Sequence, residues 1–322
     1  MSTSGGYHAV MLPQSEFSVK LMACLQYFKI PYTWSLMNPR NKKLLPGPGL
    51  IPVLKTPDGK IIYDTMEIFN WLNENEERCK GKIYPKNLDR SMVEEIEVTC
   101  EIVYCHSQFI FSRKEYFDKC QYEKWDDFLK TQNCLIRCLL SARKVQQKFE
   151  KAIPAMIKDK IGYDSIDFEN PTKGFQKTME IFESILKKNK GQYLLGNTDG
   201  PTAPDFALYG MLVKLLPPGF MGFMPTLYEN ISILADPNNG NPYRLLQKWH
   251  ENMASISNFN NDSWADVSLT VTPERPNIKS ITEPFGTPES TIIQFDPKKH
   301  GKRVLKHIDH DTVISKFGVS DF

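Results

Sequence analysis

The chain has 322 residues, of which 41% are hydrophobic, and this length predicts two folded domains, each with its own core. Forty lysines and arginines nearly balance thirty-eight aspartates and glutamates, so the net charge does not favour a nucleic-acid partner or a membrane surface. The first six residues are short and polar and no apolar run is long enough to span a bilayer, which predicts a cytoplasmic protein.

The first elements follow the pattern strand, helix, strand. Residues 7–12 predict a strand, and residues 14–29 predict an amphipathic helix with Val19, Met22 and Leu25 on its buried side. Residues 30–33 lead into a second strand.

A kinked strand and a hairpin come next. Ile51-Pro52 is a step at which a cis peptide bond costs little, and it precedes the short β-rich runs 53–55 and 61–63. Residues 57–59 read Pro-Asp-Gly, a turn sequence, so the two runs predict a β-hairpin.

A well-marked helix start follows the hairpin. Asp64 and Thr65 can both cap the first helical turn, and Asp64 with Glu67 has the spacing of a capping box. Because a helix N-terminus attracts anions, this start next to a kinked backbone suits the carboxylate of a small peptide.

The remaining two-thirds of the chain predicts mainly helices. Apolar residues recur at helical spacing over 89–113, a second long helical stretch covers about 122–149, and Pro154 is predicted to interrupt a third. Further helices are predicted over 175–188, 202–216 and 242–253. The 202–216 stretch is apolar nearly all round, with Thr202 and Asp205 at its start, which predicts a buried and capped helix with a structural role.

After residue 262 repeated prolines break any helix, and the runs 268–272 and 291–295 predict short strands. We expect this tail to pack across the helical domain or to mediate assembly. Its histidines match no common metal-ligand spacing, so no metal site is predicted; they are His300, His307 and His310. The seven cysteines include no Cys-x-x-Cys pair and predict reduced thiols. Cys134 and Cys138, one helical turn apart, suit a metal or a disulfide less well than a buried apolar role.

These motifs together resemble the glutathione S-transferase superfamily over about the first three-quarters of the chain. The resemblance implies an α+β thioredoxin-like N-terminal domain over residues 1–85 and an all-helical C-terminal-like domain over 89–262, with 263–322 as an irregular extension. In that family the Ile-Pro step is cis and pairs with the cysteinyl part of glutathione. Ile51 and Pro52 therefore align with that role, and Asp64-Thr65 aligns with the step that binds the γ-glutamyl end.

The resemblance also places the reactive group. The family's serine position falls on Ser15, with Ser18 one turn later, so Ser15-Glu16-Phe17-Ser18 replaces the Cys-x-x-Cys of redox relatives. Without those cysteines a disulfide-exchange mechanism has no nucleophile. Ser15 as donor to a glutathione thiolate and Ser15 as a plain helix cap are equally compatible with the sequence.

Three further residues are candidates for the site. Lys43 lies in the loop before Pro52, where it can meet the glycyl carboxylate or remain a solvated lysine. Tyr104 and Phe109 lie late in the first long helix, where they can line a hydrophobic substrate pocket or belong to a core or dimer face.

The resulting hypothesis is a serine-type, homodimeric glutathione transferase, or a related isomerase, with glutathione as co-substrate and a hydrophobic electrophile as second substrate. The alternative is a non-catalytic module of the same fold that acts as an interaction scaffold or ligand carrier. Glu16, Thr65 and the long tail favour this alternative, whereas the joint presence of Ser15, Pro52 and Asp64-Thr65 favours the enzyme.

Overall fold

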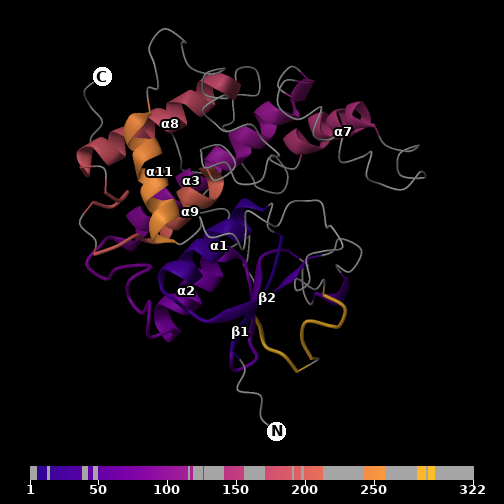
Figure 1. The fold of residues 1–322 in the computed structure, drawn as a ribbon, viewed down its shortest axis with the longest axis vertical. Coiled ribbons are helices and arrows are strands. Elements are labelled where there is room, and N and C mark those ends of the chain that lie inside the picture. Colours follow the sequence, from indigo (N-terminus) through magenta and orange to yellow (C-terminus); the bar gives the residue numbers. More distant parts are fainter. Residues whose placement is uncertain are drawn as a thin grey trace.

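The structure is a computed structural model with a sheet-containing N-terminal part and a mostly helical remainder (Figure 1). It describes residues 6–12, 15–37, 43–45, 50–114, 117–118, 126, 141–155, 171–190, 192–196, 199–212, 243–257, 281–287 and 289–293. Figure 1 shows the sheet and helices α1 and α2 in the lower half of the view and the helical part above them. This is the thioredoxin-like and helical architecture predicted from the sequence.

The sheet has five strands in the order β2-β1-β3-β4-β5. Strands β1 (Tyr7–Met11) and β2 (Tyr32–Leu36) are parallel, whereas β3 (Val53–Lys55) is antiparallel to both β1 and β4 (Ile61–Tyr63). The hairpin formed by β3 and β4 is therefore confirmed. The fifth strand, β5 (Ile292–Ile293), comes from the tail and pairs parallel to β4.

Alternation along the strands gives the sheet two apolar faces. One face supplies Ala9, Met11, Leu54 and Ile62 to the large core shared with the helices. The opposite face carries Val10, Val53, Ile61 and Tyr63, which belong to a second, smaller apolar cluster. Since β1, β3 and β4 carry buried residues on both faces, each face of the sheet requires a cover.

Helices α1 (Glu16–Tyr27) and α2 (Thr65–Asn75) pack on the large-core face. Ser15 is the N-cap residue of α1, and Asp64 caps α2 by accepting a hydrogen bond from the Met66 amide at 2.8 Å. The Asp64 side of the predicted capping box is therefore present, and both helices begin close to the residues that the sequence indicates.

The helical part contains α3 (Arg90–Ser112), α7 (Ala142–Ala155), α8 (Pro171–Lys188), α9 (Ala203–Leu212) and α11 (Arg244–Ile256). Pro154 lies inside α7, one residue before the end of the described segment 141–155, so the predicted interruption at Pro154 stays a prediction. The domain boundaries at residues 85, 89 and 262 stay predictions.

Helix α9 is buried along its whole length, as its apolar sequence predicts. A close approach to α1 depends on Gly210, because a Cβ atom there would lie 2.6 Å from the carbonyl oxygen of Glu16. Glycine lets the two helix backbones approach at this point. Helix α9 thereby joins the helical part to the N-terminal domain.

The described part of the tail, residues 281–287 and 289–293, lies along the N-terminal domain. Figure 1 shows it in orange-yellow beside the sheet, and its residues Ile281 and Phe285 are buried in the second apolar cluster. The described tail residues 281–293 thus cover the sheet instead of crossing the helical domain. The predicted strand at 291–295 corresponds to β5 over two residues, whereas the predicted strand at 268–272 and the tail histidines lie outside the described residues.

The described part of the chain contains four cysteines, all buried free thiols, in agreement with the predicted reduced state; they are Cys24, Cys79, Cys100 and Cys105. Cys134 and Cys138 lie outside the described residues. Among the described residues, no cluster of three or more histidine, cysteine or acidic side chains could hold a metal ion, and no helix is apolar and long enough to cross a membrane.

Candidate functional site

The register of the sheet brings the three predicted site segments to one edge. Val10, Val53 and Tyr63 lie side by side across β1, β3 and β4. From this row β1 leads on to Ser15, β3 is preceded by Ile51-Pro52, and β4 leads directly to Asp64. Ser15 and Asp64, 49 positions apart in the sequence, therefore converge where two helices begin.

Ser15 has an available hydroxyl at the start of α1. Its backbone amide donates to the carbonyl oxygen of Leu12 at 2.8 Å, but its side chain makes no capping hydrogen bond to the helix. Ser15 therefore occupies the N-cap position of α1 without capping the helix through its hydroxyl. An uncommitted hydroxyl beside helix amides can donate to an anion.

Ser18 is placed differently from a group that meets a ligand. It is fully buried, and its hydroxyl oxygen accepts a hydrogen bond from the Leu12 amide at 3.2 Å. This contact closes the turn between β1 and α1. The catalytic role predicted for Ser18 stays a prediction, and in the structure its hydroxyl is engaged in this turn.

The peptide bond between Ile51 and Pro52 is cis, as predicted. Pro52 is buried, whereas Ile51 is half-buried and packs against the second apolar cluster. Lys43 lies in the preceding loop with an exposed side chain, next to Leu44 and the buried Leu45. Its position is compatible with contact to a ligand carboxylate at the same edge.

Asp64 holds an unusual backbone conformation, with φ 74° and ψ 136°. Such a conformation is uncommon for a residue with a side chain, and it turns the chain sharply from β4 into α2. Burial raises the pKa of Asp64, against the opposing effects of the Lys20 charge and the Met66 amide. Thr65 is the first helical residue and is 2% exposed, so its hydroxyl lies at the N-terminal end of α2.

The predicted pocket residues Tyr104 and Phe109 have different surroundings. Tyr104 is half-buried, and its ring packs edge-on against Phe17, two residues after Ser15, with the ring centroids 5.4 Å apart. Phe109 is 3% exposed and belongs to the main core. The structure thus brings Tyr104 to the Ser15 end of α1, whereas the pocket prediction for Phe109 is replaced by the core role.

Glu16 is buried beside this aromatic pair. Its carboxylate accepts a hydrogen bond from the side-chain amide of Gln108 at 3.2 Å. Burial raises the pKa of Tyr104, and the Glu16 carboxylate adds to that effect. The Tyr104 hydroxyl therefore stays protonated at neutral pH.

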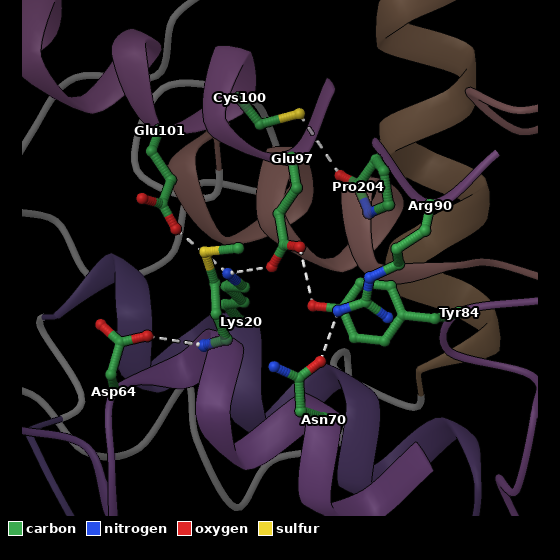
Figure 2. Close-up of polar contacts among 10 residues, drawn as sticks. Lys20, Asp64, Asn70, Tyr84, Arg90, Glu97, Cys100, Glu101 and Pro204 are labelled. Atoms are coloured by element: carbon green, nitrogen blue, oxygen red, sulfur yellow. Dashed lines mark hydrogen bonds and ion pairs between the residues drawn. The ribbon is translucent and has the colours of Figure 1, made fainter. Parts of the chain in front are cut away.

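A buried charge cluster, which the sequence analysis missed, joins the site to the helical part (Figure 2). Lys20 is fully buried, and its ammonium lies 2.7 Å from Glu97 and 3.1 Å from Glu101. It also lies 5.1 Å from the ring centroid of Phe69. Burial alone would lower the pKa of Lys20, but the two carboxylates outweigh it and raise that pKa. The sequence signal was a single lysine inside the apolar run of residues 19–25.

The cluster continues toward the start of α3. The Tyr84 hydroxyl donates to the second oxygen of Glu97 at 2.8 Å, and the Arg90 guanidinium stacks 3.3 Å from the Tyr84 ring centroid. Figure 2 shows Arg90 also reaching Asn70 of α2. Helices α1, α2 and α3 are therefore joined by charge-assisted contacts directly behind the candidate site.

Comparison with protein-family models gives one match, to the N-terminal domain of glutathione S-transferases, over residues 14–75. This match covers α1, the cis Ile51–Pro52 step and the whole of α2. Residues 14–75 are thus similar to the N-terminal domain of glutathione S-transferases, and the sheet-containing N-terminal part of the chain is here named the transferase-like domain.

Solved structures of several glutathione transferases are similar to the chain. A family member from Pseudomonas fluorescens, described with two glutathione bound, is 11% identical with a TM-score of 0.49 and covers 80% of this chain and 93% of its own. An Actinobacillus pleuropneumoniae transferase is 14% identical with a TM-score of 0.46, covering 82% and 94%. A Lodderomyces elongisporus homologue, described with two glutathione molecules per subunit, is 14% identical with a TM-score of 0.44, covering 80% and 100%. No curated protein sequence matches the chain.

Glu101 of α3, which pairs with Lys20 of α1, gives the protein a pH-dependent stability. Burial raises the pKa of Glu101 to about 7, the Lys20 charge opposes this, and Asp64 adds to it. An acid with a raised folded-state pKa retains a proton that the unfolded chain has lost, so the free energy of unfolding falls as pH rises from about 4.5 to about 7. Because the side chain is 27% exposed, solvent screening reduces the effect to about 1–3 kcal/mol.

We expect Glu101→Gln to remove most of this dependence. Its free energy of unfolding, relative to the parent protein, should rise by about 1–3 kcal/mol between about pH 5 and pH 8. Urea unfolding at several pH values measures the difference. A difference that stays constant across this range would contradict the assignment to Glu101.

Proposed function

We propose that the protein is a serine-type glutathione transferase that adds the glutathione thiol to a hydrophobic electrophile. The observation that carries the proposal is the convergence of Ser15, the cis Ile51–Pro52 step and Asp64-Thr65 at one sheet edge, within a segment that matches the transferase family model. That edge combines two helix N-termini with a half-buried hydroxyl.

The parts of glutathione fit this edge by charge. The Thr65 hydroxyl and the positive end of the α2 dipole would suit the γ-glutamyl carboxylate, and the Asp64 carboxylate would suit the ammonium group beside it. The Ile51 backbone would pair with the cysteinyl unit, and Lys43 would meet the glycyl carboxylate. These contacts place the thiol close to the start of α1.

Ser15 would then activate the thiol. Its hydroxyl would donate a hydrogen bond to the thiolate, and the dipole of α1 would add to the stabilisation, so that the thiol proton is released to solvent near neutral pH. The thiolate would attack the electrophilic carbon and form a thioether, while the bond from that carbon to a leaving group, or the π bond of an activated alkene, breaks and takes up the electron pair. The protein supplies thiolate stabilisation and proximity. Phe17 and Tyr104 would offer an apolar contact next to the reacting sulfur.

Calorimetric titration of glutathione into the full chain tests the proposal. We expect Thr65→Val to weaken binding about tenfold or more, since it removes a hydroxyl from the first turn of α2. We expect Ser15→Ala to preserve binding but to raise the pKa of the bound thiol by about one unit or more, measured by ultraviolet absorbance of the thiolate.

Thr178→Val is the matched control, because it removes a buried threonine hydroxyl from α8 in the helical part. It should leave both readouts unchanged. Absence of binding at millimolar glutathione would contradict the proposal and favour the non-catalytic scaffold. The homodimer implied by the resemblance and the cytoplasmic location predicted from the sequence remain part of this proposal. Sedimentation of the purified chain measures its oligomeric state.

A further inference from the structure

The described tail residues 281–293, here named the tail strap, cover the sheet face opposite to α1 and α2. The strap begins 25 residues after the last residue of α11, yet it packs on the first domain of the chain. Ile281 is 6% exposed and Phe285 is 7% exposed. Both side chains fill the second apolar cluster, so the strap is an integral part of the N-terminal domain.

Backbone hydrogen bonds fix the strap at three places. The Ile281 amide donates to the carbonyl oxygen of Leu36 at 3.2 Å, beyond which the chain enters the loop that carries Lys43. The Phe285 amide donates to the carbonyl oxygen of Leu44 at 2.9 Å, one residue after Lys43. At the other end the Ile61 amide donates to the carbonyl oxygen of Thr291 at 2.8 Å, where β5 joins β4.

The side chains of the strap pack against the same elements. Phe285 shares its cluster with Leu45, and the half-buried Leu44 and Ile51 pack on that cluster. The Phe285 ring also lies 5.7 Å from the ring of His8 on β1, measured between centroids. Every segment that leads to a candidate glutathione contact is thus in the cluster or next to it: Lys43 through Leu44 and Leu45, Pro52 through Ile51, and Asp64 through Tyr63.

A glycine permits the close fit of strap and sheet. A Cβ atom on Gly286 would overlap the Cδ1 atom of Ile61 and would lie 3.0 Å from the hydroxyl oxygen of Ser290. The hydroxyl of Ser290 accepts a hydrogen bond from the Thr287 amide at 3.0 Å, which closes the turn before β5. The strap is therefore shaped to lie directly on β4.

We propose that the tail strap holds the Lys43 loop and the strand ends at Pro52 and Asp64 in their binding positions, which makes Phe285 a positioning residue for glutathione. This inference rests on the proposed function for the identity of the ligand. The packing part of it, that the strap restrains the Lys43 loop, stands on the contacts of the described residues alone. Rigid segments bind with less ordering cost, so loosening them weakens affinity without touching the reacting atoms.

The test compares Phe285→Ala, Phe285→Leu and Leu186→Ala in the full chain. Leu186→Ala is the matched control, because it also removes a buried apolar side chain, but from α8 in the helical part. We expect Phe285→Ala to raise the glutathione dissociation constant about tenfold. Phe285→Leu should recover most of the affinity, and Leu186→Ala should bind like the parent.

Amide hydrogen exchange supplies a second readout that needs no ligand. In Phe285→Ala we expect at least tenfold faster exchange in peptides that contain residues 43–45, with no change in peptides from α8. If Phe285→Ala does not fold, Phe285→Leu carries the comparison with smaller shifts in both readouts.

The outcomes separate this inference from the proposed function. If the parent binds glutathione and the Phe285 variants bind it equally well, the strap proposal is overturned and the proposed function stands. If the parent does not bind glutathione, the proposed function fails. The strap is then judged by exchange alone, where faster exchange at 43–45 supports it and unchanged exchange overturns it.

Discussion

Replacing Asp205 by alanine should lower the free energy of unfolding by about 4 kcal/mol or more. The fully buried carboxylate of Asp205 accepts four hydrogen bonds, at 2.9–3.1 Å, from the Leu194 amide, the Thr202 amide and hydroxyl, and the Trp249 indole. Each buried donor left without a partner costs about 1–3 kcal/mol. Because whole domains are stable by only about 5–15 kcal/mol, the helical part should be close to unfolding.

Two variants separate this effect from simple loss of a helix cap. Asp205→Asn keeps the size and one acceptor oxygen, and should lose about half as much stability. Asp89→Ala removes the N-cap carboxylate of α3, which is exposed and accepts from Ser91, and should cost only about 1 kcal/mol. Denaturant unfolding monitored by circular dichroism gives all three values. An Asp205→Ala cost as small as that of Asp89→Ala would show that the four contacts are not the cause.

The contacts of Asp205 show which structural features can be predicted from the sequence. Thr202 and Asp205 are three residues apart, so local spacing predicts the cap at the start of α9. The two other donors to Asp205, Leu194 and Trp249, lie 11 and 44 residues away from it in the sequence. They meet it through tertiary packing, which no local sequence pattern reports. The cis Ile51–Pro52 step, the hairpin and the Asp64 cap were likewise predicted because each is encoded within a few residues.

Long-range contacts are the features that the sequence does not report. Ser18 has the spacing of a catalytic residue, but its surroundings depend on Leu12 and on the core beneath α1. Phe109 has a helical pattern that fits a pocket and a core equally well, and only the packing of α3 decides between them. The return of the strap to β4 joins residues 231 positions apart, as in the pair Ile61 and Ile292, and a two-residue strand gives almost no sequence signal.

Lys20 is the second residue whose replacement should have a large effect. Lys20→Met removes the buried ammonium, which leaves the Glu97 carboxylate fully buried without its counter-charge. Removing one partner of a buried ion pair lowers the free energy of unfolding by about 3–5 kcal/mol, since neither water nor a cation then stabilises the remaining charge. We expect a loss of that size in denaturant unfolding at neutral pH.

The pH dependence and a double variant identify the cause. Lys20 lowers the pKa of Glu101 and of Asp64, so its removal should raise both pKa values. Protonation of these acids then removes part of the uncompensated buried charge. The stability deficit of Lys20→Met should therefore shrink as pH falls below about 6. Lys20→Met with Glu97→Gln should recover at least half of the loss, because glutamine is neutral and still accepts from the Tyr84 hydroxyl.

An exposed lysine provides the control for this argument. Lys80 pairs with Glu77 at 2.9 Å on the surface, with both side chains more than half exposed, and Lys80→Met should change stability by less than about 0.5 kcal/mol. If Lys20→Met costs no more than Lys80→Met, or if the double variant is less stable than the single one, the buried charge is not what stabilises this junction. If the expected pattern is found, the ion pair between Lys20 of α1 and Glu97 of α3 is essential for the stability of the contact between the N-terminal domain and the helical part. The same lysine acts on the charge of Asp64.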